Sequence, residues 1–76
     1  MRVPHLLILG TGSVGRRHAR NFQALGCLVS CMDPRQDRLE EAGRDLSLKH
    51  QFVSLEAALA RSEEFSGIVI CSPPKF

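Results

Sequence analysis

Apolar runs and helically spaced residues alternate along the 76-residue chain. Residues 5–9 and 67–71 are almost continuously apolar, which is typical of parallel strands buried on both faces. Residues 27–32 form a third run of this kind, and a proline that cannot continue a strand ladder follows it closely. We predict a short additional strand at residues 51–53.

Three segments between these runs have the spacing of helices, at residues 13–25, 36–46 and 55–61. In the first two, one face is expected to pack on the sheet. Its side chains are Val14, His18, Ala19, Phe22 and Leu25 in the first helix, and Leu39, Ala42 and Leu46 in the second. Gly26 is suited to end the first helix, and Ser54 is a good N-cap for the third.

The resulting order is βαβαβαβ, which predicts an α/β fold with a parallel four-stranded sheet of order 3-2-1-4 and three helices. The first two helices would cover one face of the sheet, and the third would cross the other. The fourth strand would lie at an apolar edge, which makes that edge a candidate for self-association.

A glycine motif stands where the first strand gives way to the first helix. Gly10, Gly12 and Gly15 form a G-x-G-x-x-G pattern. Such glycines permit a tight turn, a close approach of the backbone to a pyrophosphate, and close packing of helix on strand. The backbone N–H groups of Ser13 and Val14 are expected to face the phosphates at the helix N-terminus.

An acidic residue follows the second strand, as a dinucleotide-binding unit requires. Asp33 comes 18 positions after Gly15, and its carboxylate is expected to accept hydrogen bonds from the adenosine ribose. Its charge would repel a 2′-phosphate, which favours NAD. Arg35 and Arg38 leave NADP as an alternative, because an arginine just after the second strand can hold a 2′-phosphate. Pro34 and Arg35 complete the predicted cofactor-binding set on this side. The alternative is that Asp33 is an acidic turn residue at the end of a strand, before Pro34, without a role in ligand binding.

Composition excludes several other classes of function. The formal net charge of +2 and the absence of Trp and Tyr argue against a nucleic-acid partner. The apolar runs are too short for a membrane span or a secretory signal. The chain has an odd number of cysteines, Cys27, Cys31 and Cys71, and no C-x-x-C pattern. We therefore expect free thiols in a reducing cytoplasm. His5 and His50 lack metal-ligand spacing, and no metal is expected.

With His18 added, the chain resembles the N-terminal part of the Gfo/Idh/MocA oxidoreductases. That family carries G-x-G-x-x-G-x-x-H, matched by the three glycines and His18, and a T-P-P-like segment, here Ser72-Pro73-Pro74. The resemblance implies an NAD(P)-binding Rossmann domain, with Ser72 and Pro73 shaping the cofactor site. The full-length relative would transfer hydride between nicotinamide and a sugar-like alcohol or ketone.

The resemblance also implies what these 76 residues do not carry. The family's E-K-P segment with its catalytic lysine is absent, as is its second domain, so no catalytic residue is assigned. We expect residues 1–76 to be the N-terminal half of a dinucleotide-binding domain, inactive alone. The alternatives are a nucleotide-sensing regulatory module without turnover and a glycine turn without a ligand. His18 has a second interpretation as a packed core residue, and Arg16, Arg17 and Arg20 as a solvated helix face.

Overall fold

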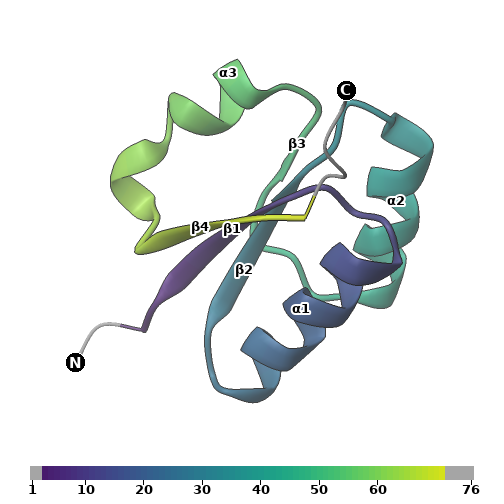
Figure 1. Cartoon of the computed structure of the whole chain (residues 1–76). Helices are drawn as coiled ribbons and strands as arrows, with labels where there is room; N and C mark the ends of the chain where they lie inside the picture. Colours follow the sequence, from purple (N-terminus) through teal and green to yellow (C-terminus); the bar gives the residue numbers. More distant parts are fainter. Residues whose placement is uncertain (1–2, 72–76) are drawn as a thin grey trace.

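The computed structural model describes residues 3–71 and confirms the predicted architecture (Figure 1). Four parallel strands form one sheet of order β3-β2-β1-β4. In chain order the elements are β1 (His5–Leu9), α1 (Ser13–Ala24), β2 (Leu28–Met32), α2 (Gln36–Asp45), β3 (Gln51–Phe52), α3 (Leu55–Leu59), the 3₁₀ helix η1 (Ser62–Glu64) and β4 (Gly67–Ile70).

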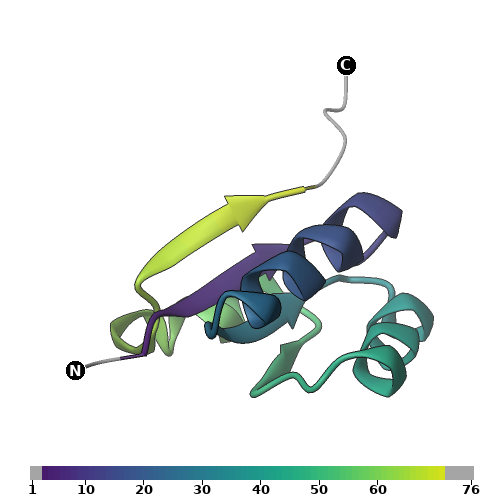
Figure 2. The same cartoon turned by 90° about the horizontal axis from the view of Figure 1, so that it is seen from below.

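The core has two layers because successive residues of a strand point to opposite faces of the sheet. On one face, Ile8, Val29 and Cys31 pack against α1 and α2, and on the other face Leu7 and its neighbours pack against α3. Figure 2 shows α1 and α2 on one side of the strands, as predicted, with α3 behind them. Helix α3 has five residues, so this second face receives little cover.

Helix α1 ends one residue earlier than predicted because the chain closes it with a Schellman motif. Gly26 has a φ of 90°, and its N–H donates to the Gln23 carbonyl at 2.9 Å. The N–H of Cys27 reaches back to the Phe22 carbonyl at 3.0 Å, so the strand begins at Leu28 instead of residue 27. A glycine is needed here because left-handed backbone strains other residues.

The predicted core face of α1 was partly wrong. Ala19 is buried as predicted, but Val14 and Leu25 are 45% and 79% exposed, and Gly15 is buried instead. The two buried positions are four residues apart and small, so the helix turns its narrowest side to the sheet and lies close to it. His18 and Phe22 remain half-buried beside that line, with their rings 6.4 Å apart.

The third helix is shorter than the predicted 55–61, because α3 ends at Leu59 and the separate 3₁₀ helix η1 follows it. Ser54 caps α3 as expected, its Oγ accepting from the Ala57 N–H at 3.1 Å. The backbone of Arg61, at φ −114° and ψ 26°, then leaves the α region and starts η1. This break carries Glu64 to the amino ends of the strands.

Strand β4 lies at the edge of the sheet described for residues 3–71, next to β1 (Figure 2). Its side chains Ile68 and Ile70 are 48% and 74% exposed on the face that α3 covers only in part. Self-association through this edge stays a prediction. Within the same residues, no helix combines the length and apolarity needed to cross a bilayer.

Candidate functional site

The turn between β1 and α1 can be built only with glycine at two positions. Gly10 has a φ of 104°, and its N–H donates to the Met32 carbonyl at 2.8 Å, which ties the turn to the end of β2. A Cβ on Gly15 would overlap the carbonyl oxygen of Gly10. The motif therefore lets the start of α1 sit directly on the end of β1.

The N-terminus of α1 has neither of two features that stabilise the start of a helix, a side-chain cap or an acidic residue in the first turn. Its N-cap is Gly12, no side chain accepts from its first turn, and that turn holds no acidic residue. By contrast, α3 has a serine cap and Glu56, whereas α2 also lacks a side-chain cap but has Asp37 in its first turn. Uncapped N–H groups and the positive end of the helix dipole form a place that an anion can occupy.

Asp33 lies beside this turn and is only 5% exposed. Its Oδ2 accepts from both the N–H and the hydroxyl of Thr11, each at 2.8 Å, and its Oδ1 accepts from the N–H of Arg35 at 2.9 Å. Burial raises the pKa of Asp33, but these hydrogen bonds and the charge of Arg38 outweigh it, so the pKa is lowered overall. A charged carboxylate is thus held in place next to the helix N-terminus.

A cavity of about 430 Å³ opens at the same place. Its lining residues are Thr11, Gly12, Ser13, Arg16, Arg38 and Glu41. Arg38 approaches the turn, with Nη1 3.5 Å from where a Cβ on Gly12 would stand. Arg16 was expected on a solvated face. Instead, its Nη1 lies 3.5 Å from Asp45 Oδ2 and 3.9 Å from Glu41 Oε1, and these ion pairs join α1 to α2. The cavity rim therefore carries the guanidinium groups of Arg16 and Arg38 and the carboxylate of Glu41, beside the uncapped start of α1.

Most of the predicted site residues come together at the carboxyl ends of β1 and β2. Gly10, Gly12, Ser13, Val14 and Gly15 form the turn and the first helical residues, and Asp33 faces them. Pro34 is exposed; Arg35 gives Asp33 its backbone N–H, while its guanidinium lies 3.8 Å from Asp37. Ser72 and Pro73 lie outside the described residues.

Sequence reasoning missed Thr11. This residue stands between the first two glycines, is 2% exposed, and supplies two of the three hydrogen bonds described for the Asp33 carboxylate. The available signal was a hydroxyl side chain within a turn, where Ser and Thr often form hydrogen bonds. Its partner, 22 positions away, becomes visible only once β1 and β2 pair.

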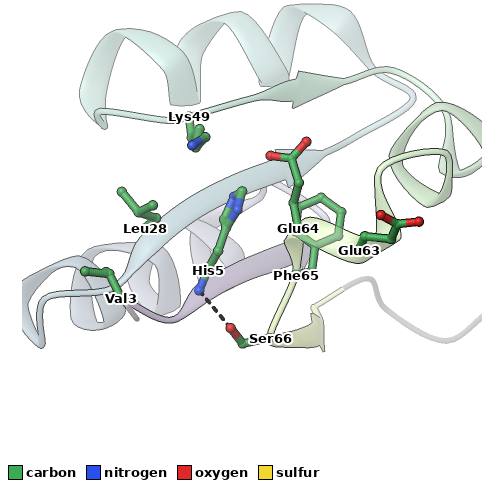
Figure 3. A pocket seen from close by; sticks show the side chains of 8 residues that line it. All are labelled: Val3, His5, Leu28, Lys49, Glu63, Glu64, Phe65 and Ser66. Carbon is green, nitrogen blue, oxygen red and sulfur yellow. Dashed lines mark hydrogen bonds between the residues drawn. The ribbon is translucent and has the colours of Figure 1, made fainter. Parts of the chain in front are cut away.

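A second cavity of about 450 Å³ lies at the opposite end of the sheet (Figure 3). His5 stands in it between Lys49 and Ser66, with Glu64 close by. His5 is 4% exposed, burial lowers its pKa, and its Nε2 lies 2.7 Å from the Ser30 hydroxyl. Nearby, His50 Nε2 lies 2.9 Å from Glu64 Oε1.

The Ser30 hydroxyl also accepts from the His50 backbone N–H at 3.1 Å, so these contacts join β1, β2, the residue before β3 and η1. Within residues 3–71, His, Cys, Asp and Glu form no group suited to a metal ion. Ligands of open parallel sheets bind at the carboxyl ends of the strands, which is the end with the glycine turn. We therefore assign the network around His5 to the stability of the fold.

Comparison with known proteins identifies a family whose match includes the glycine turn. The family described as D-isomer specific 2-hydroxyacid dehydrogenase, NAD binding domain, matches residues 2–74. No curated protein matches the chain significantly. The match supports a Rossmann-type NAD-binding domain of an oxidoreductase, with NAD as cofactor, but it does not support the narrower resemblance to the Gfo/Idh/MocA family. The chain belongs to the family of NAD-binding domains of D-isomer specific 2-hydroxyacid dehydrogenases.

Proposed function

We propose that this chain binds NAD at the glycine turn as the cofactor-binding part of a hydride-transferring dehydrogenase. The pyrophosphate would lie over the uncapped N-terminus of α1, and the adenosine ribose would lie against Asp33. The proposed binding residues are Gly10, Gly12, Ser13, Val14, Gly15, Asp33, Pro34, Arg35, Ser72 and Pro73. The observation that carries the proposal is the buried, charged carboxylate of Asp33 beside the uncapped helix.

The same carboxylate supports NAD over NADP. Two unit charges 4 Å apart repel by about 4 kcal/mol at an effective dielectric constant near 20. A 2′-phosphate next to Asp33 would experience this repulsion, partly offset by Arg38. A ribose hydroxyl would instead donate a hydrogen bond to the charged oxygen, which strengthens the contact.

The reaction we propose for the complete protein is hydride transfer between the nicotinamide and a carbon that carries a hydroxyl or keto group. Bound NAD supplies the hydride chemistry, while this chain binds and orients the cofactor. The family description favours a 2-hydroxy acid as the substrate class. The G-x-G-x-x-G-x-x-H motif with His18 supports the alternative of a sugar-like alcohol or ketone, as in the Gfo/Idh/MocA proteins.

We further propose that residues 1–76 are the N-terminal half of the dinucleotide-binding domain. A doubly wound dinucleotide-binding fold has two βαβαβ halves, and the four strands and three helices described here correspond to little more than one. We place no catalytic residue in these 76 residues. Substrate-binding and proton-transferring groups would lie in another part of the protein.

Titration with nucleotides tests the proposal directly. The chain contains no Trp, so the nicotinamide fluorescence of NADH can be followed without energy transfer from that source. We expect saturable binding of NADH, weaker binding of NADPH, and little binding of ATP or S-adenosylmethionine. Equal binding of NADH and ATP would favour a nucleotide-sensing module instead, and absence of binding to all four would contradict the proposal.

A further inference from the structure

Thr11 is placed to control how Asp33 meets a ligand. Its backbone N–H and its hydroxyl both donate to the same carboxylate oxygen, Oδ2, at 2.8 Å. The other oxygen, Oδ1, accepts only from the Arg35 N–H among the described contacts, at 2.9 Å. Both Thr11 and Asp33 are buried, at 2% and 5% exposure, so water does not compete freely for these bonds.

Counting acceptor positions shows what remains for a ligand. An ionised carboxylate has about four lone-pair positions, two on each oxygen. Thr11 occupies both positions on Oδ2, and Arg35 occupies one on Oδ1. One position on one oxygen is left, and its direction is set because three hydrogen bonds hold the carboxylate.

We propose that the Thr11 hydroxyl is a positioning group that fixes Asp33 for a single ribose hydroxyl and so sets the preference for NAD over NADP. The inference rests on the proposed function. The 2′-hydroxyl of NAD can donate its proton to Oδ1. The 2′-phosphate of NADP is nearly fully ionised near neutral pH, so it has little to donate and meets a negative charge that cannot turn away.

Arg38 explains why the position of the carboxylate matters. Its positive charge acts on Asp33, and its guanidinium lies beside Gly12 at the same cavity. A carboxylate without the hydroxyl bond could turn toward this cation. The site would then lose part of the charge that repels a phosphate and keep a cation that attracts one.

Two substitutions of Thr11 in the full chain test the proposal, with the dissociation constants of NADH and NADPH as readout. Thr11→Val keeps the shape and the backbone N–H but removes the hydroxyl. We expect it to weaken NADH binding about tenfold and NADPH binding less than about twofold, the scale of a hydrogen bond to a charged group. Thr11→Ser restores the hydroxyl and is expected to restore the wild-type ratio of the two constants.

A purely structural role for Thr11 predicts a different outcome. Thr11→Val would then weaken both cofactors by the same factor, and an unchanged ratio would overturn the inference while leaving the proposed function intact. Loss of the ratio in Thr11→Ser would also overturn it. If the wild-type chain binds neither cofactor, the proposed function fails and this inference fails with it.

A second test uses modified cofactors with the wild-type chain, so it does not depend on whether a variant folds. If a single acceptor position faces the 2′-hydroxyl, 2′-deoxy-NADH should bind about tenfold more weakly than NADH, and 3′-deoxy-NADH should bind almost as well. Equal losses for the two analogues would mean that Asp33 accepts from both hydroxyls. That result would overturn the geometry proposed for Thr11.

Discussion

The Cα of Gly15 lies so close to the carbonyl of Gly10 that any Cβ at position 15 would overlap the carbonyl oxygen. The oxygen belongs to the backbone of a turn that is itself tied to β2 by the Gly10 N–H. Neither partner can move without separating α1 from β1. The third glycine of the motif therefore determines how closely the helix approaches the strand.

Gly15→Ala is accordingly expected to destabilise the chain and weaken NADH binding together. Overpacking of this kind typically costs about 1–3 kcal/mol. Gly43→Ala is the matched control on α2, because its Cβ would meet only the end of the Gln51 side chain, which can rotate away. Alanine in that helix should stabilise by about 0.5–1 kcal/mol. Urea denaturation of both variants checks the contrast, and equal effects would contradict it.

Asp33→Ala tests the ribose contact. Removing the carboxylate abolishes the charged acceptor, so the dissociation constant of NADH should rise more than tenfold, while that of NADPH should rise less because the repulsion is also lost. Glu40→Ala removes an exposed carboxylate from α2 and serves as the control for general charge effects. Fluorescence titration gives the constants. An unchanged value for NADH in Asp33→Ala would remove Asp33 from the site.

The topology was predictable because each strand is a local apolar run and the rules for parallel connections leave few arrangements. The sheet order and the faces assigned to α1, α2 and α3 follow from those rules. The face of α1 was harder to predict. Val14 and Leu25 belong to its apolar side, yet the close approach that Gly15 permits brings Gly15 to the sheet beside the correctly predicted Ala19, and leaves Val14 and Leu25 exposed.

The candidate site was predictable where one short motif carries it and not where distant residues meet. The glycines and Asp33 have a known spacing and chemistry. Thr11 acquires its role through a partner 22 positions away, and His5 meets a Ser30 hydroxyl 25 positions away. Such contacts depend on the register between β1 and β2, in which His5 lies opposite Leu28. Helical or strand periodicity does not encode that register.

The cysteines should differ in reactivity in the folded chain. Burial first, and then the neighbouring Cys71 and Asp33, raise the pKa of Cys31 to about 12, so only about one thiol in ten thousand would be ionised near pH 8. Burial also raises the pKa of Cys71. With iodoacetamide we expect Cys27 to be alkylated first and Cys31 last, as mapped by mass spectrometry. In urea all three should react at similar rates, and fast labelling of Cys31 without urea would contradict its burial.

Stability in acid should reflect the charge of Asp33. Its pKa is lowered from the ordinary value of 3.8 on folding, so its contribution is complete above that value and is lost as the pH falls through the lower folded value. Glu64 acts in the same direction, because its bonds to His50 and Arg61 lower its pKa from 4.5. The urea midpoint should therefore fall as the pH is lowered below about 4.

Asp33→Asn separates the contribution of Asp33 from general acid effects. The amide cannot accept with a full charge and turns its NH₂ group toward donors, so the variant should be less stable than the wild type near pH 7. The gap should narrow as the pH falls, because protonation then removes the same charge from the wild type. Glu64→Gln is the companion variant, and it should reduce how strongly the urea midpoint depends on pH. Urea midpoints of wild type and both variants between about pH 7 and 3 give the measurement, and a gap for Asp33→Asn that stays constant over this range would show that the charge of Asp33 does not stabilise the fold.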